Sequence, residues 1–324
     1  MHISILGGGG FLGARLARTL AASGELGGWA VSSLTLFDLE PPAAPAARFP
    51  VHALGGDIAE LPAAAIPPGT DVVFHLAAVV SAAAEADYEL GRRVNVRGTD
   101  AVIDSCRQLA RPPRVVFASS VASFSGMPGQ VLGDDARQLP ANSYGTQKAA
   151  AELFLSDASR RGFLDAACLR LPTVIVRPGR PNKAASSFFS GIVREPLLGL
   201  PADLPAPDDA AAWVASPRRV IEWLRHAAAM DAGGLGLDRG INPPGLSVTV
   251  AEIVAALEAV RPGASALIRR VEDPGIARIV AGWPAAFDPT RAIGLGFAAH
   301  EPLLELVQAF VEDDLEATRR DRAA

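Results

Sequence analysis

A tyrosine and a lysine four residues apart, Tyr144 and Lys148, are the residue types in this chain best suited to acid–base chemistry. They follow Pro140, which ends the preceding segment, and Asn142 and Ser143, which are favourable N-cap residues. A helix is therefore predicted to begin here, with both side chains on one face. The Lys148 ammonium would stabilise the phenolate and lower the pKa of Tyr144, so that the phenol oxygen exchanges a proton with an alcohol or a carbonyl. Taken alone, the pair more often belongs to a solvated helix face, and the rest of the chain must support the functional interpretation.

The N-terminus contains a glycine-rich turn between a predicted strand and a predicted helix. His2 to Leu6 is apolar, GGGGFLG follows at positions 7–13, and helical periodicity begins at Ala14. Glycines at this spacing allow a tight turn, close approach of the backbone to a pyrophosphate, and packing of the helix on the strand. The free N–H groups of the helix then face the phosphates. The turn predicts a dinucleotide site built from Gly7, Gly10, Phe11, Leu12 and Gly13, whereas a plain turn is the alternative.

Two acidic residues at predicted strand ends are candidates for the adenosine half of that dinucleotide. Asp38 ends the strand 33–38, about 25 residues after the glycines, where a carboxylate would bind the ribose 2′-hydroxyl. It would repel a 2′-phosphate and so favour NAD over NADP, although a helix cap or turn is the alternative. A third strand within 49–56 precedes Asp57 and Ile58, which could contact the adenine, and an ordinary turn is an equal alternative.

Strand and helix alternate through the first half of the chain. Residues 71–78 and 114–119 are continuous apolar runs typical of buried parallel strands, and a helix is predicted between them from about 87 to 109. This alternation predicts an α/β fold, a Rossmann-like doubly wound parallel sheet with a smaller C-terminal lobe. Ligands bind at the carboxyl ends of such strands, where Ser119 and Ser120 emerge. Either serine could hold a substrate oxygen or merely cap the loop.

Composition excludes several classes of function. The 324 residues are 49% hydrophobic with a formal charge of −5 and no run of Lys or Arg, which argues against nucleic-acid binding. No stretch approaches eighteen uninterrupted strongly apolar residues, and no signal peptide precedes the first strand, so we expect a cytoplasmic protein that does not bind membranes. Cys106 and Cys168 lack CxxC spacing and are expected to be buried free thiols. The five scattered histidines give no support for a metal site.

The glycine turn, terminal acid, strand-end serine and Tyr-x-x-x-Lys resemble, in this order, the extended short-chain dehydrogenase/reductase family over nearly the whole chain. The resemblance implies that Tyr144 is the general acid/base, that Lys148 orients the nicotinamide ribose and that Ser120 binds the reacting oxygen. It also implies NAD as cofactor. The further residues expected to contact NAD are Ala77, Ala78, Asn95, Leu171 and Thr173.

Within that family the chain is similar to the D-erythronate dehydrogenases, often labelled as epimerase/dehydratase-like proteins. The segments that carry the similarity are 143–148, 170–173, 177–179, Pro181-Asn182, 187–192, 215–218 and 267–270. The implied reaction is NAD-dependent oxidation of a four-carbon sugar acid, D-erythronate, at its C2 hydroxyl. Its carboxylate needs a cation, and a bidentate arginine suits it. Arg177 and Arg218 are both candidates, and Ser81 and Thr173 are expected to line the substrate site with Ser120 and Tyr144.

Beyond residue 175 the alternation becomes irregular. We therefore expect an NAD-binding domain over 1–175 and a mainly substrate-binding lobe over 176–324, with some interleaving. Amphipathic helices are predicted at 248–260, with Thr249 as a possible cap, and at 303–316. The resemblance also implies a homodimer formed through the helix that carries Tyr144 and Lys148 and through its neighbour.

Two alternatives share these motifs. A nucleotide-sugar 4-epimerase would oxidise its substrate only transiently and retain NAD, and a noncatalytic NAD-sensing protein would use the same fold. A 4,6-dehydratase is disfavoured, because Val121 and Ala122 occupy the places of the Asp-Glu pair of those enzymes.

Overall fold

A sheet of seven parallel strands forms the centre of the computed structural model, which describes residues 1–127, 129–180 and 185–323. Pro181 and Asn182 lie outside these residues. The strand order is β13-β9-β7-β6-β1-β4-β5. Its strands are β1 His2–Leu6, β4 Ser33–Asp38, β5 Val51–Gly55, β6 Thr70–His75, β7 Arg114–Ser120, β9 Asp165–Leu171 and β13 Gly240–Ile241. The order reverses at β1 and β6, which creates a topological switch point at their carboxyl ends. The predicted doubly wound sheet is confirmed.

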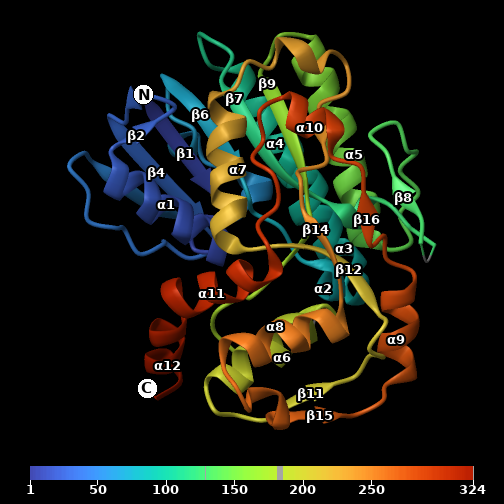
Figure 1. Cartoon of the computed structure of the whole chain (residues 1–324). Coiled ribbons are helices and arrows are strands. Elements are labelled where there is room, and N and C mark those ends of the chain that lie inside the picture. Colours follow the sequence, from blue (N-terminus) through green and yellow to red (C-terminus); the bar gives the residue numbers. More distant parts are fainter. Residues whose placement is uncertain (128, 181–184, 324) are drawn as a thin grey trace.

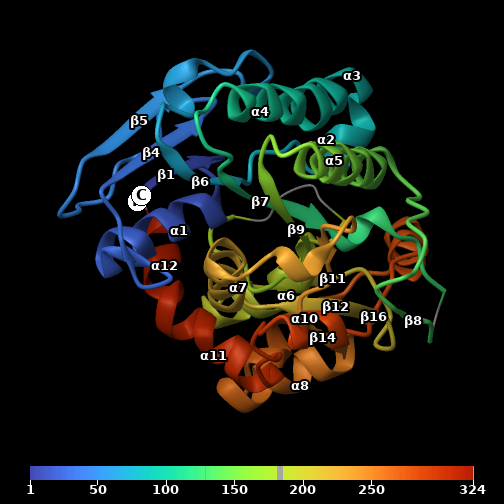
Figure 2. The ribbon, with the colours of Figure 1, turned by 90° about the horizontal axis from the view of Figure 1, so that it is seen from above.

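Helices cover both faces of this sheet (Figure 2). Helices α1 (Phe11–Ser23) and α7 (Pro217–Ala229) pack on one face, and α4 (Gly98–Arg107) and α5 (Ser143–Arg160) pack on the other. Successive strand residues point to opposite faces, so Phe74 contacts the first layer and Val73 the second. Helix α7 and strand β13 come from beyond residue 175 and yet belong to the main sheet and its helix layer. This is the interleaving that the sequence led us to expect.

The connection from β6 to β7 is more irregular than predicted. In place of one helix from 87 to 109, the chain forms α2 (Ser81–Ala86), α3 (Tyr88–Gly91), a π-helical segment Arg92–Arg97 and then α4. A π-helical segment is a local distortion that frequently occurs at functional sites. Here it contains Asn95, which is buried.

The second half of the chain builds a smaller lobe with its own core, below the main sheet in Figure 1. Three helices pack there against the short sheet β10-β12-β14. These elements are α6 Ser187–Leu197, α8 Val250–Val260, α11 Leu303–Asp313, β10 Thr173–Val174, β12 Ala211–Ala215 and β14 Leu246–Thr249. Thr249 caps α8 in a reciprocal bond pair with Glu252, as the sequence predicted. The helix expected over 303–316 ends earlier, because α11 is capped at Asp314.

The remaining elements are short. They are β2 Glu25–Leu26, β3 Trp29–Ala30, β8 Val131–Leu132, β11 Ala202–Leu204, β15 Ile268–Arg270, α9 Pro274–Ala281, β16 Ala286–Phe287, α10 Thr290–Gly294 and α12 Leu315–Ala323. Strand β11 pairs with β15, and β8 pairs with β16. Figure 1 shows α9 connecting the lower lobe to β16 beside the main sheet.

Helix α5 approaches the main chain after β7 unusually closely. A Cβ atom on Gly145 would lie 1.9 Å from the carbonyl oxygen of Ala122 and 2.8 Å from its carbonyl carbon. Only glycine allows this backbone contact. The first turn of α5, which carries Tyr144, is therefore held directly against the loop that follows Ser120.

We predict that Gly145→Ala destabilises the protein and reduces turnover at least tenfold. The methyl group must displace α5 from the Ala122 carbonyl, at a cost of about 1 to 3 kcal/mol. Gly191→Ala is a matched control, because Gly191 lies within α6 and its added Cβ would meet nothing within 4 Å. Thermal unfolding should show a lower Tm only for Gly145→Ala. Equal stability and activity of both variants would contradict the close contact.

Candidate active site

The carboxyl ends of β1, β6, β7 and β9 meet at a cleft of about 340 Å³. The glycine turn, the loop after β6 and the first turn of α5 line it, together with residues from the start of the smaller lobe. Ser120, Tyr144 and Lys148 all face this cleft. The three residues that the sequence nominated for catalysis are therefore brought together.

Tyr144 and Ser120 are in direct contact. The Ser120 hydroxyl hydrogen-bonds to the Tyr144 phenol. Ser119, the alternative in the sequence, points elsewhere: its side chain is buried and its hydroxyl donates to Glu152. The structure thus distinguishes the two serines, and Ser120 is the one that lies beside Tyr144.

Lys148 lies one helical turn below Tyr144 and is fully buried. Its Nζ donates to the backbone oxygen of Ala118 at 2.7 Å, and it lies 4.5 Å from the centroid of the Phe117 ring and 5.6 Å from that of Tyr144. Burial lowers the pKa of Lys148 to about 7, and the Glu152 carboxylate opposes this effect. Burial likewise lowers the pKa of nearby His75 to about 3, so this imidazole is neutral and hydrogen-bonds with Thr99 at 3.0 Å.

Arg177 supplies the charge that acts on the phenol. Burial raises the pKa of Tyr144, while the hydrogen bond from Ser120 and the positive charge of Arg177 lower it. The sequence predicted that Lys148 would exert this electrostatic effect. In the described structure the Lys148 ammonium is directed to Ala118, and Arg177 is the cation that favours the phenolate.

The glycine turn fits a dinucleotide. A Cβ on Gly13 would lie 2.0 Å from the carbonyl oxygen of Gly7, and Gly7 itself has φ of +89°. Helix α1 begins after Gly10, which provides no side-chain cap, so its first N–H groups remain available to a phosphate. Five residues of the turn line the cleft: Gly7, Gly10, Phe11, Leu12 and Gly13.

Asp38 lies beside this turn, whereas Asp57 does not line the cleft. The Asp38 carboxylate accepts hydrogen bonds from the N–H groups of Gly9 at 2.9 Å and Leu39 at 2.8 Å, which orients it at the end of β4. Asp57 instead caps a short 3₁₀ turn and forms an ion pair with Arg93 at 2.5 Å. Ile58, the neighbour of Asp57, is buried in the core beneath α4. These contacts give Asp57 and Ile58 structural roles that do not require a cofactor.

Asn95 supports the cleft from behind. Its side chain accepts from the Val79 N–H at 2.9 Å and donates to the Val79 oxygen at 3.0 Å and to Gln147 at 2.6 Å. It therefore fixes the loop after β6 against α5. In that loop Ala78 lines the cleft. The backbone of Ala77 packs against Gly7, where an added Cβ would lie 2.6 Å from the Ala77 nitrogen.

The two candidate arginines occupy different places. Arg177 lines the cleft, as do Ser81, Leu171 and Thr173. Arg218 is 41% exposed on α7 and pairs with Glu312 at 2.8 Å and Asp313 at 2.7 Å, outside the cleft. Those carboxylates also raise the pKa of Arg218. The expectation that Arg218 binds a substrate carboxylate does not fit this position, because its guanidinium is already paired with two carboxylates of α11 outside the cleft.

Sequence reasoning missed part of the cleft wall. Asn142, read only as a cap, both caps α5 and lines the cleft. Trp213, expected to be packing, is 6% exposed and yet also lines it. Trp283, which follows α9, closes the cleft from the smaller lobe and borders an adjoining hollow of about 1130 Å³. No local pattern marks Trp283, because its position depends on how α9 crosses between the lobes.

The two cysteines are placed as the sequence predicted. Cys106 and Cys168 are buried free thiols. Among the described residues, no group of three or more His, Cys, Asp or Glu side chains could hold a metal ion. Across the same ranges, none of the helices has the length and apolarity needed to span a membrane.

Comparison with known proteins places this geometry in a family. Residues 3–211 match the NAD dependent epimerase/dehydratase family. A D-erythronate dehydrogenase of Cupriavidus necator is 45% identical over 324 residues, covering 97% of this chain and 98% of that protein. A D-erythronate dehydrogenase of Haemophilus influenzae is 38% identical over 329 residues, covering 97% of this chain and 100% of that protein.

A solved structure shares the fold. The crystal structure of the nucleoside-diphosphate-sugar epimerase from Agrobacterium tumefaciens superposes with a TM-score of 0.92 at 44% identity. The match covers 98% of this chain and 95% of that one. With the glycine turn, Asp38 and the Ser120, Tyr144 and Lys148 cluster in place, the chain belongs to the NAD dependent epimerase/dehydratase family and is an NAD-dependent dehydrogenase.

Proposed function

We propose that this protein oxidises the C2 hydroxyl of D-erythronate, a four-carbon sugar acid, to 2-dehydro-D-erythronate. The observation that carries the proposal is a small cleft in which Ser120, Tyr144 and a half-buried arginine, Arg177, face the same space beside the glycine turn. The first pair suits an alcohol, and the arginine suits a carboxylate. The names of the two curated relatives support the same substrate.

The reaction separates into a hydride and a proton. NAD, when bound, supplies the acceptor for the hydride from C2. Ser120 holds the C2 oxygen by a hydrogen bond, and Tyr144, as phenolate, removes the hydroxyl proton. Arg177 and Ser120 lower the pKa of this phenol against the effect of burial, which brings the base form closer to working pH. When NAD is bound, Lys148 would hold the nicotinamide ribose with its ammonium.

Arg177 is the proposed carboxylate ligand. Its Nε donates to the Val174 oxygen at 3.1 Å, which orients the guanidinium, and its own carbonyl accepts from Arg194 at 2.8 Å. Burial lowers the pKa of Arg177, so the binding of an anion compensates a charge that is poorly solvated. Ser81 and Thr173 complete the polar lining for the remaining hydroxyls.

A nucleotide-sugar 4-epimerase is the second candidate, and one observation favours it. The adjoining hollow of about 1130 Å³ is far larger than a four-carbon acid requires. It borders the cleft at Ser81, Ala122, Asn142 and Trp283. A nucleotide could occupy such a space, and the solved relative from Agrobacterium tumefaciens carries an epimerase name.

We also propose that residues 176–324 mainly form the substrate-binding lobe, and that two copies associate through α5. Leu153 and Phe154 on α5 are 69% and 45% exposed, and Tyr88 and Leu90 on neighbouring α3 are 56% and 40% exposed. Together they form an apolar face suited to a second copy. Cytoplasmic location, which we also propose, would be refuted if cell fractionation found the protein elsewhere.

We predict that Asp38→Ser lowers the preference for NAD over NADP at least tenfold. The carboxylate repels the 2′-phosphate of NADP, and a repulsion of this kind amounts to about 1 to 4 kcal/mol between surface and partly buried positions. The ratio of kcat/KM values with the two cofactors is the measurement. Asp57→Asn should leave that ratio unchanged, because Asp57 pairs with Arg93. If Asp57→Asn altered the ratio and Asp38→Ser did not, the assignment of Asp38 as the carboxylate that selects NAD would be wrong.

The proposed reaction predicts NADH formation from NAD and D-erythronate, with little or none from L-threonate and UDP-sugars. Tyr144→Phe should abolish turnover while it preserves NAD binding, because only the proton acceptor is removed. Turnover of a UDP-sugar without net NADH, by protein that carries tightly bound NAD, would support the epimerase. Full activity of Tyr144→Phe would reject the mechanism.

The same assay separates the two arginines. Arg177→Met should reduce kcat/KM for D-erythronate about 100-fold, since a charge-assisted bidentate contact contributes roughly 1.5 to 3 kcal/mol. Arg218→Met is matched in side-chain chemistry and should remain within about twofold of wild type. The reverse pattern would place the carboxylate at Arg218.

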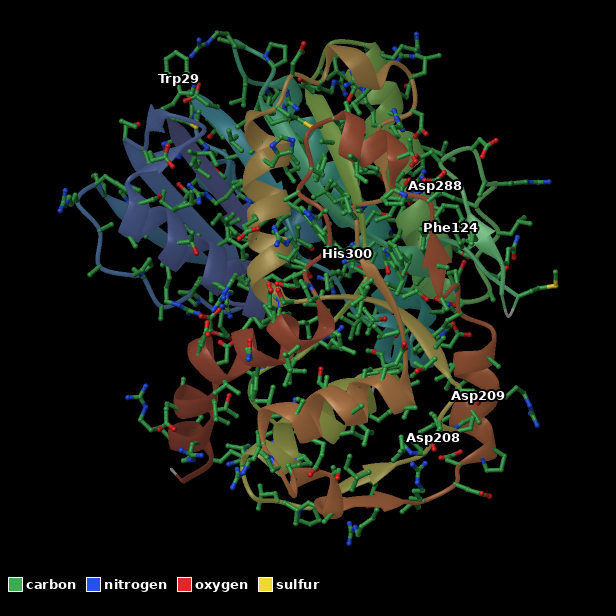
Figure 3. The ribbon with its side chains drawn as sticks, viewed as in Figure 1. Trp29, Phe124, Asp208, Asp209, Asp288 and His300 are labelled. Carbon is green, nitrogen blue, oxygen red and sulfur yellow. The ribbon has the colours of Figure 1, made fainter. Side chains whose placement is uncertain are left out.

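We predict that Leu153→Glu combined with Phe154→Glu converts a dimer to a monomer, measured by light scattering. A buried, unpaired carboxylate at the contact disfavours association. Trp29→Glu is the control: Trp29 is 70% exposed and lies on the opposite side of the molecule from α5 (Figures 1 and 3). A monomeric wild-type protein, or a dimer in the double variant, would refute this interface.

A further inference from the structure

Glu152 is a buried carboxylate that the proposed reaction does not use. It lies on α5, four residues after Lys148 and eight after Tyr144, so the three side chains follow one face of the helix. Its residue is only 4% exposed. A carboxylate removed from water to this extent requires specific partners.

Three successive residues of β7 bind this helix face. The Ser120 hydroxyl contacts the Tyr144 phenol, and the Ala118 oxygen accepts from Lys148 at 2.7 Å. Between them, the Ser119 hydroxyl donates to the Glu152 carboxylate. Strand β7 therefore holds Glu152 as well as Tyr144 and Lys148.

The opposite side of the Glu152 carboxylate is held by two other elements. Arg170 on β9 donates to it through Nε and Nη2, each at 3.0 Å, and Gln138 from the loop before α5 donates at 3.0 Å. The Arg170 guanidinium in turn lies 5.1 Å from the ring centroid of Phe124, which Figure 3 labels. Glu152 thus connects α5 to two strands and a loop at once.

Glu152 also determines the charge around Lys148. The titratable groups that face Lys148 are His75 from β6, Cys168 from β9, and Tyr144 and Glu152 from its own helix. His75 is neutral because burial lowers its pKa to about 3, and burial raises the pKa of Cys168 so that the thiol is neutral too. Burial also raises the pKa of Tyr144, so until the phenol loses its proton Glu152 is the one of these four groups whose charge stabilises the ammonium.

We propose that Glu152 is a positioning residue that fixes the register of α5 on β7 and keeps Lys148 charged beside Tyr144. The proposal rests on the role given to Lys148 in the proposed function. The buried ion pair of Glu152 with Arg170 lies outside the reacting groups. Its carboxylate would keep Lys148, the proposed cofactor-binding cation, protonated.

The first test is Glu152→Gln, which preserves shape and removes the charge. Without the carboxylate the pKa of Lys148 falls, so Lys148 loses its proton at a lower pH. The ratio of kcat at pH 6 to kcat at pH 8 should then rise about fivefold, as expected when the pKa of Lys148 falls by about one unit from about 7. Asp157→Asn, which removes an exposed carboxylate from the same helix, should leave the ratio unchanged.

A second variant separates the effect of the lost charge on Lys148 from a loss of stability. Glu152→Gln removes the nearer carboxylate partner of Arg170 and leaves Asp238 at 3.8 Å, so its Tm should fall, whereas Glu152→Gln with Arg170→Met removes both charges and should recover stability. If Glu152 acts on Lys148, the double variant keeps the altered pH ratio. A return to the wild-type ratio would instead assign the effect to the charge of Arg170 and overturn the proposal.

NAD binding provides a readout that does not depend on the substrate. The affinity of Glu152→Gln for NAD should fall more at pH 8 than at pH 6, measured by titration calorimetry. If wild type oxidises no sugar acid, the proposed function fails but this measurement still tests Glu152. A folded Glu152→Gln protein with wild-type pH dependence of both NAD binding and turnover would overturn the inference.

Discussion

The contact between the first turns of α5 and the end of β7 is the constraint on which the site depends. Gly145 lets the helix backbone reach the Ala122 carbonyl, and no larger residue fits there. A helix is stiff over this length, so that one backbone contact sets the height of Tyr144 above Ser120 and of Lys148 above Ala118. The reacting groups are thus positioned by packing, which is the arrangement that preorganised catalysis requires.

Burial makes this arrangement effective but also costly. A phenol out of water keeps its proton, and an ammonium out of water loses it, so both groups shift away from the charged forms that the proposed chemistry needs. Nearby charges oppose each shift: Arg177 acts on Tyr144, and Glu152 acts on Lys148. Arg177 from the smaller lobe therefore favours the phenolate of Tyr144, and Glu152 from α5 favours the ammonium of Lys148.

Much of this could be predicted from sequence, because the decisive signals are local. Apolar runs identified the central strands, and the glycine turn and the Tyr144 and Lys148 pair are each contained within a few residues. The rule that ligands bind at strand ends narrowed the choice to two serines, and the family resemblance selected Ser120, which is the serine that contacts Tyr144 in the structure. Helix ends and the π-helical segment depend on packing and were placed less accurately.

The parts of the site that depend on distant contacts could not be predicted. Arg177 and Arg218 are equivalent in sequence, and only the carboxylates of Glu312 and Asp313, nearly a hundred residues from Arg218, distinguish them. Asp57 lies just after β5, much as Asp38 ends β4, yet Asp57 forms an ion pair with Arg93. Trp283 enters the cleft from the other lobe. In each case the tertiary neighbour, and not the residue type, determines the role.

The most direct test of the account follows the hydride itself. D-Erythronate carrying deuterium at C2 would be incubated with NAD and the purified protein, and the products would be analysed by NMR and mass spectrometry. Hydride transfer from C2 should place one deuterium on the nicotinamide ring of NADH for each 2-keto acid formed, at a slower rate than with unlabelled substrate. Release of deuterium to water, or its return to the sugar carbon with inverted configuration, would contradict oxidation at C2 by hydride transfer.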